Sequence, residues 1–400
     1  MAWRQQPVYR TARGSLLTKG ASSQKGPVTS MQYKPFKDNL SLSTLGMGNM
    51  RLPVQRLGTK IDRPKAGEII DYAMANGINY YDTAYVYHFG ESEKFLGEAL
   101  KKYPRESYHL ATKYYMMATK NYKKVFEEQL KRLQTDYIDF YLIHCIMDVT
   151  WKRYINSGCI EYFLEQKAKG RIKYLGFSSH AGVEALSSFA DYTKWDFAQI
   201  QLNYFDWFYG NTRKEYKTLE ERGLPIIVME PVRGGKLASL NKEAEALLKE
   251  AHPDWSIASW ALRFVKSLPQ VQVVLSGMST LSQIQDNVAT FGEEGGLTEK
   301  DKEILLQACE LFHGQFKIPC TACHYCLGEC PKEIRIPAYL DLYNAYKAGE
   351  PGALKQLGQV DSKGTPADCI GCGKCRSHCP QSIEIPQIMK ELAQAAPDRE

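Results

Sequence analysis

Short apolar segments alternate with longer stretches of helical periodicity between residues 40 and 295. In residues 63–77, RPKAGEIIDYAMANG, apolar side chains recur at helical spacing and Gly77 ends the pattern, which predicts an amphipathic helix. The apolar segments between such helices are candidate strands, and they cover residues 41–48, 78–84, 108–113, 138–144, 172–178, 197–203, 225–230 and 271–277. Eight strand and helix units favour an α/β fold whose strands close into a (β/α)8 TIM barrel. An open doubly wound sheet is less well supported, because no GxGxxG motif follows an early strand.

The strand pattern stops near residue 297. Beyond it, helical patterns cover residues 298–313, 336–349 and 386–396, and cysteine-rich runs separate them. We therefore predict a barrel over residues 31–296 and a smaller, mainly α-helical domain over residues 297–400.

The formal net charge of +6 is concentrated at the N-terminus, where residues 1–30 contain five Lys or Arg side chains and no acid. Without these five charges the rest of the chain carries +1, so it offers no excess charge for a phosphate backbone. We expect no nucleic-acid partner. Residues 1–30 are rich in Ser, Thr and Gly, and we expect them to form a disordered basic extension.

No apolar run approaches the roughly 18 residues that span a bilayer, and the N-terminus lacks a signal-peptide core. These features predict a cytoplasmic protein without a membrane partner. Cysteine usage agrees with a reducing compartment, since eight of the 11 cysteines fall in two runs after residue 319. Such clustering indicates metal binding rather than a disulfide scaffold.

The two runs share the spacing Cys-x2-Cys-x2-Cys-x3-Cys-Pro and begin at Cys320 and Cys369. This is the bacterial ferredoxin pattern for 4Fe-4S clusters, in which the fourth cysteine of each run ligates the other cluster. On that rule, the ligands are Cys320, Cys323, Cys326 and Cys379 for one cluster, and Cys369, Cys372, Cys375 and Cys330 for the other. Structural zinc is the alternative, because four thiolates also suit Zn²⁺. Zinc usually takes two separated CxxC pairs, so two complete runs favour two 4Fe-4S clusters.

Cys369 follows Cys320 by 49 positions, which is more than a minimal two-cluster ferredoxin needs. Much of this insert has a helical pattern, so the domain resembles the α-helical ferredoxin domains of multi-subunit reductases. Two clusters that share ligand runs lie close enough for rapid electron hopping. We therefore expect a ferredoxin-like electron-transfer domain.

Polar residues stand at the carboxyl ends of successive predicted strands, where the chemistry of a TIM barrel is expected. Asp82, Lys113 and His144 close the second, third and fourth strands, and Tyr87 lies in the loop after the second. A tyrosine is a better acid when a nearby lysine stabilises its phenolate, and a buried lysine needs a carboxylate partner. With a histidine to orient a carbonyl, these residues could protonate its oxygen while hydride reaches its carbon. Taken singly, each has an ordinary explanation as a helix cap, a surface lysine or a core histidine.

The sequences GINYYDTAYVYHFGESEKFLGEALK, LATK and DFYLIH resemble the aldo-keto reductase superfamily, and the resemblance covers about residues 35 to 295. It implies that Asp82, Tyr87, Lys113 and His144 form a catalytic tetrad with Tyr87 as the general acid, and that Tyr85 forms a wall of the pocket. The whole chain is similar to a branch of the superfamily whose members append a ferredoxin-type domain.

The resemblance also implies a nicotinamide dinucleotide, NADP(H) or NAD(H), extended across the barrel mouth. Met229 stands where many members stack a tyrosine on the nicotinamide, and Gln283 replaces an arginine that often grips the 2′-phosphate. The implied contacts are Ser178 and Gln201 at the carboxamide and Gly277, Ser279, Gln283 and Asn287 at the adenosine end.

Taken together, these features predict an oxidoreductase that reduces a carbonyl or related small-molecule substrate. Its electrons would come from NAD(P)H, from the two clusters, or from both. Nicotinamide moves a hydride while a cluster moves one electron, so a flavin in the barrel and an electron-transfer protein partner remain open. The alternative function is an electron-transfer subunit or a redox sensor in which the barrel is a docking scaffold.

Overall fold

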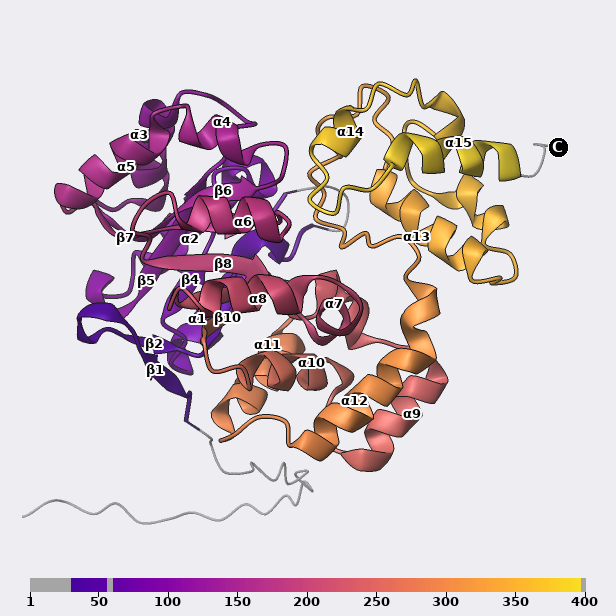
Figure 1. Ribbon diagram of the computed structural model, residues 1–400, viewed down its shortest axis with the longest axis horizontal. Helices are drawn as coiled ribbons and strands as arrows, with labels where there is room; N and C mark the ends of the chain where they lie inside the picture. The colour runs from indigo at the N-terminus through magenta and orange to yellow at the C-terminus, as the bar shows by residue number, and fades with distance from the viewer. Residues whose placement is uncertain (1–29, 56–59, 397–400) are drawn as a thin grey trace, which may run out of the picture.

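The computed structural model describes residues 30–55 and 60–396 (Figure 1). Most of the expected N-terminal extension, residues 1–29, lies outside these ranges. Eight parallel strands close into a barrel in the order β10-β3-β4-β5-β6-β7-β8-β9, which confirms the predicted fold class. The strands are β3 (Leu45–Gly48), β4 (Tyr80–Asp82), β5 (His109–Tyr114), β6 (Ile138–Ile146), β7 (Ile172–Ser179), β8 (Phe197–Gln201), β9 (Ile226–Met229) and β10 (Val271–Ser276).

The segment predicted as one strand, residues 41–48, is divided in the structure. Its first part, β2 (Ser41–Ser43), pairs antiparallel with β1 (Tyr33–Pro35), and β3 begins at Leu45. The division follows from a local bond, because the Ser43 hydroxyl donates to the Leu45 carbonyl and turns the chain between the two strands. Leu42 from this hairpin packs into the apolar cluster inside the barrel and closes its amino-terminal end.

Helices surround the barrel, and their ends follow the expected capping chemistry. Asp62 accepts a hydrogen bond from the Lys65 amide at the start of α1, and Gly77 adopts a left-handed φ of 80° after its end. The helices in this part of the chain are α1 (Arg63–Ala75), α2 (Glu91–Leu100), α3 (Tyr122–Leu133), α4 (Trp151–Ile155), α5 (Cys159–Ala168), α6 (Val183–Ala190), α7 (Tyr204–Tyr209), α8 (Thr212–Glu220), α9 (Lys242–Ala251), α10 (Ile257–Lys266), α11 (Leu281–Gly292) and α12 (Glu299–Phe312). Among the described helices, none combines the length and the apolar character needed to cross a bilayer.

Helix α12 lies beside α9 in Figure 1, and its buried side chains Leu305 and Phe312 belong to the main core of the barrel. The boundary expected at residues 296 and 297 therefore falls before a helix that packs with the barrel. After α12 the chain enters a smaller region that contains α13 (Ile336–Lys347), α14 (Lys374–Ser377) and α15 (Ile385–Ala395). This region, which we call the cluster region (residues 318–396), has its own apolar core and includes all eight cysteines of the two runs.

The cluster region covers the carboxyl ends of the barrel strands. The Arg51 guanidinium, just after β3, donates to the Thr321 carbonyl at 2.7 Å, and the Thr321 hydroxyl donates to Glu230, just after β9, at 3.1 Å. At the end of β8, Gln201 accepts a hydrogen bond of 2.8 Å from Gln381. Because these contacts come from both cysteine runs, the region is fixed over the barrel mouth at more than one point.

Gly234 permits the closest approach between the two parts. A Cβ built at this residue would lie 2.1 Å from the Thr321 carbonyl oxygen, so no other residue type fits without movement. Gly235 also has a left-handed φ, 96° against 68° for Gly234, but a Cβ there meets nothing within 4 Å. The neighbouring glycines thus separate the effect of contact from the effect of backbone conformation.

We expect Gly234→Ala to loosen the docking of the cluster region, because the added methyl group must displace the Thr321 carbonyl. The cost is about 1–3 kcal/mol beyond the conformational cost. Gly235→Ala is the matched control, since it has the conformational cost of about 1–2 kcal/mol without the clash. The measurement is thermal unfolding together with hydrogen exchange of residues 318–325. Equal melting temperatures and equal exchange in the two variants would contradict this account.

Candidate active site and cluster sites

A buried ion pair lies at the mouth of the barrel. Lys113 in β5 donates to the Asp82 carboxylate at the end of β4, with Nζ and Oδ1 2.6 Å apart, and to the Thr83 carbonyl at 2.7 Å. The Lys113 side chain has no exposed surface, and that of Asp82 is 4% exposed. Burial raises the pKa of Asp82 and lowers the pKa of Lys113, and the attraction between the two charges opposes both shifts. The two residues are therefore energetically dependent on each other.

Tyr87 and His144 lie against this pair. The Lys113 ammonium is 4.9 Å from the centre of the Tyr87 ring, and the rings of Tyr87 and His144 are 5.9 Å apart at nearly a right angle. Burial, followed by the negative charge of Asp82, raises the pKa of Tyr87 well above its usual value, so its hydroxyl keeps its proton. Burial, followed by the charge of Lys113, holds the pKa of His144 well below its usual value, so its imidazole stays neutral. The structure thus brings together the four residues that the sequence suggested as a tetrad.

One large cavity joins this group to the start of α11. It has a volume of about 340 Å³, and its lining includes Asp82, Tyr87 and His144. Four of the six residues suggested for the nucleotide also line it, namely Gly277, Ser279, Gln283 and Asn287. A cavity shared by the tetrad residues and the start of α11 suits a dinucleotide.

Local hydrogen bonds fix the residues that we expect at the adenosine end. The Gln283 side-chain oxygen accepts from the Ser279 amide at 2.7 Å and from the Thr280 amide at 3.2 Å, so it caps α11. The Asn287 amide donates to the Ser276 hydroxyl at 2.8 Å. The start of α11 faces this cavity, and the positive end of a helix dipole attracts phosphate.

Ser178 and Gln201 are placed differently from the other four, because neither lines this cavity. The Ser178 hydroxyl accepts from the Cys145 amide at 2.8 Å, and the Gln201 amide donates to Asp206 at 2.8 Å while its oxygen accepts from Gln381. Gln199 lines the cavity instead, and its side-chain oxygen is buried without a hydrogen-bond partner among the described residues. Gln199 lies two positions before Gln201, on the same face of β8, so alternation in the strand was a signal that could have revealed it.

Glu230 is a further cavity residue that sequence reasoning missed. It follows β9 directly, with a left-handed φ of 55°, and burial raises its pKa to about 7. One carboxylate oxygen accepts from the Thr321 hydroxyl, and the other has no partner among the described residues. The available signal was an acidic residue at the carboxyl end of a predicted barrel strand.

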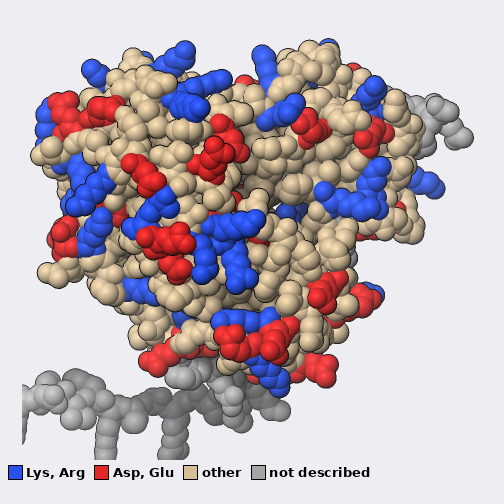
Figure 2. Space-filling view, in the orientation of Figure 1, with Lys and Arg blue, Asp and Glu red and all other residues tan. Residues whose placement is uncertain are grey.

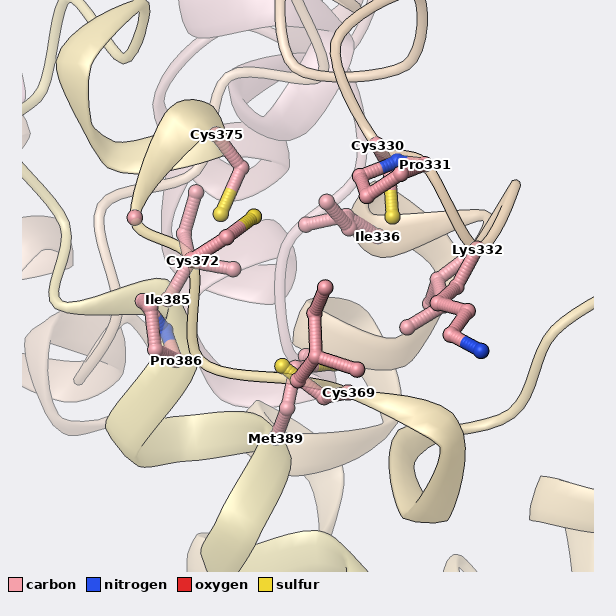
Figure 3. A pocket seen from close by; sticks show the side chains of 13 residues that line it. Cys330, Pro331, Lys332, Ile336, Cys369, Cys372, Cys375, Ile385, Pro386 and Met389 are labelled. Atoms are coloured by element: carbon pink, nitrogen blue, oxygen red, sulfur yellow. The ribbon is translucent and has the colours of Figure 1, made fainter.

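The cysteine side chains line two small cavities in the cluster region. One is lined by Cys330, Cys369, Cys372 and Cys375, and Figure 3 shows their sulfur atoms placed around it. The second is lined by Cys320, Cys323, Cys326 and Cys379. These are the two sets expected when the fourth cysteine of each run serves the other cluster.

The cysteine sets favour clusters over zinc. Each cavity is lined by three cysteines of one run and the fourth cysteine of the other, which is the crossed pattern of two-cluster ferredoxins. Within the described residues, no group of three His, Cys, Asp or Glu side chains is arranged to hold a single metal ion. The residues of both cavities therefore fit 4Fe-4S clusters.

Comparison with known proteins agrees with this division of the chain. Residues 44–306 match the Aldo/keto reductase family, and residues 319–384 match the 4Fe-4S dicluster domain. The chain belongs to the aldo/keto reductase family. It is an oxidoreductase of this family with an added 4Fe-4S dicluster domain, which implies two clusters.

The matched relatives correspond to the barrel. The uncharacterized oxidoreductase YqkF of Bacillus subtilis is 29% identical over 302 residues, which cover 67% of this chain and 95% of the relative. The NADH-specific methylglyoxal reductase of Escherichia coli is 24% identical over 68% of this chain and 96% of its own length. Among solved structures, the holo form of an aldo-keto reductase from Bacillus halodurans is 29% identical, covers 70% of this chain and 96% of its own, and superimposes with a TM-score of 0.59. None of these descriptions supports the flavin that the sequence left open.

The crossed ligation of the clusters can be tested with pairs of cysteine variants. Replacing Cys320 and Cys379 together by Ala removes two ligands from one cluster, so we expect the other cluster to remain with its native electron paramagnetic resonance spectrum and about four irons. Replacing Cys320 and Cys330 by Ala is the matched control and should perturb both clusters. If the first pair damaged both clusters and the second pair damaged one, each run would hold its own cluster.

Proposed function

We propose that this protein uses NAD(P)H to reduce the carbonyl group of a small molecule at the barrel mouth, and that its two clusters exchange electrons with that site. The observation that carries the first part is the buried pair of Lys113 and Asp82 directly beneath the protonated Tyr87. A solved aldo-keto reductase of Klebsiella pneumoniae, which shares this fold, was determined with NADPH.

The residues divide the work as follows. Tyr87 gives its proton to the carbonyl oxygen while a hydride, with its two electrons, reaches the carbon, and the product is an alcohol. The bound nicotinamide supplies that hydride. Lys113 lowers the cost of the negative charge that Tyr87 acquires, and Asp82 keeps Lys113 charged despite its burial. Neutral His144 can donate a hydrogen bond to the same oxygen.

Cys323 supports the second part of the proposal. Cys323 lines the large cavity at the barrel mouth, which we assign to the nucleotide and call the nucleotide cavity. It also lines the smaller cavity that contains Cys320, Cys326 and Cys379, so the two cavities share this residue as a wall. A bound 4Fe-4S cluster there would supply single electrons next to the barrel mouth. An electron-transfer protein is the partner class that this arrangement would serve.

The alternative, a scaffold for electron transfer or redox sensing, is less well supported. A docking scaffold has no need of a buried ion pair, whose desolvation costs free energy. Such a pair is expected where a charge assists chemistry.

Tyr87→Phe tests the tetrad. Loss of the proton donor should lower kcat for carbonyl reduction by at least about 100-fold, while iron content and cluster reduction by dithionite stay unchanged. Tyr85→Phe is the matched control, because Tyr85 lies on the same loop as Tyr87 but lines neither large cavity of the mouth, and its hydroxyl donates to Glu128 of α3 at 2.9 Å. It should retain turnover within a few-fold of the unchanged protein. An active Tyr87→Phe protein would show that another group protonates the substrate.

The role of the clusters is tested by anaerobic titration with NADPH and then with NADH while cluster absorbance is followed. Oxidation of one NAD(P)H releases two electrons and one proton, and each of the two clusters accepts one electron, so we expect both clusters to bleach together without added flavin. Carbonyl turnover is then compared before and after chelation removes the iron. Turnover at an unchanged rate after loss of both clusters would contradict electron exchange with the barrel and leave a reductase that uses NAD(P)H alone.

A further inference from the structure

One residue of the cluster region reaches the tetrad itself. Tyr325 stands in the first cysteine run, between Cys323 and Cys326. The loop that presents it has left-handed backbone at two residues other than glycine, Ala322 with φ 50° and His324 with φ 68°. Such conformations are unfavourable unless neighbouring structure holds them, and they are frequent at functional sites.

The Tyr325 hydroxyl lies among the groups that the proposed reaction uses. Its oxygen is 3.0 Å from His144 Nε2, and it lies near enough to Tyr87 to lower the pKa of that residue, against the larger rise caused by burial. His144 Nδ1 is buried without a partner among the described residues, so the hydrogen bonding of this imidazole is directed at Tyr325. The hydroxyl therefore occupies a position between the proton donor and the imidazole, which is where a carbonyl oxygen would be held.

Packing fixes the Tyr325 ring in this place. It stacks on Tyr115, with ring centres 5.8 Å apart and planes within 18° of parallel. A second cavity, of about 530 Å³, lies between the barrel and the cluster region. Tyr87 and Tyr325 line both this outer cavity and the nucleotide cavity. A substrate that enters from the outer cavity thus meets Tyr325 at the tetrad.

We propose that Tyr325 is an active-site residue contributed by the cluster region, whose hydroxyl occupies the substrate oxygen position between Tyr87 and His144 until a carbonyl oxygen replaces it. The role of Tyr325 follows from the position of its hydroxyl and rests on the proposed carbonyl reduction. Substrate binding replaces the hydrogen bond between His144 and Tyr325 with one between His144 and the substrate. The need to displace Tyr325 therefore lowers the affinity for substrate. Because the oxygen is rigidly attached to the ring, the substrate displaces the whole phenol, and the displaced ring still limits the size of the substrate.

Tyr325→Phe removes the competing hydroxyl and keeps the wall. With propanal as the small probe, we expect KM to fall about threefold to tenfold and kcat to stay within about twofold. Tyr325→Ala also opens the wall, so 4-nitrobenzaldehyde should gain more than propanal. Tyr115→Phe is the matched control, because it removes a nearby buried hydroxyl that has no partner among the described residues and keeps the stack. It should leave KM unchanged.

Two kinetic results would overturn the proposal. An unchanged or raised KM in Tyr325→Phe would show that the hydroxyl does not compete with substrate. A kcat lowered 100-fold would make Tyr325 a group that assists the reaction. Iron content is measured for every variant, and Tyr325→Met, which also lacks the hydroxyl, is used in place of Tyr325→Phe if that protein does not take up its clusters.

A binding measurement separates this proposal from the proposed function. Acetate presents an oxygen to the same position, and its affinity for the NADP⁺-loaded protein can be measured by saturation-transfer NMR without turnover. Acetate should bind about threefold to tenfold more tightly to Tyr325→Phe than to the unchanged protein or to Tyr115→Phe. If this holds but no carbonyl is reduced, Tyr325 blocks the oxygen position and the proposed reaction is wrong. Equal acetate affinity in all three proteins would reject the role of Tyr325.

Discussion

The buried contact between Lys113 and Asp82 is the constraint on which the barrel mouth depends. Neither charge could stay buried alone, since breaking such a pair leaves an uncompensated charge at a cost of about 3–5 kcal/mol. Because the two residues come from neighbouring strands β4 and β5, the parallel register of the barrel fixes their distance. Burial is the main reason that Tyr87 keeps its proton and His144 stays neutral, and the charges of Asp82 and Lys113 reinforce both effects.

The cluster region forms part of the wall of the mouth. Arg51, Glu230 and Gln201 stand at or just beyond the ends of three different strands and contact the two cysteine runs. A loop that must wrap a cluster has little freedom left, so its contacts with the barrel are fixed by the same backbone that presents the thiolates. Cluster binding and the shape of the active site are thereby properties of one segment.

The surface and the interior play different parts. On the face seen in Figure 2, basic and acidic side chains are interspersed rather than gathered by sign, as expected for a near-neutral body. The distinctive groups are inside, where Cys323, Glu230 and Tyr325 line the same cavity as Asp82, Tyr87 and His144. A cysteine of the first run thus borders the cavity of three residues of the proposed tetrad.

The sequence by itself determined the features that local pattern encodes. Periodicity predicted eight strands, strand ends predicted Asp82, Lys113 and His144, and cysteine spacing predicted which thiolates share a cavity. Tertiary structure alone decided the rest, because docking brings together residues far apart in the chain whose pairing leaves no local signal. Tyr325 contacts His144, which is 181 positions away in the sequence. Gln381 donates a hydrogen bond to the side-chain oxygen of Gln201, which is 180 positions away. The sequence of α12 likewise has an ordinary amphipathic pattern. It is the tertiary packing, mainly against α9, that joins this helix to the barrel.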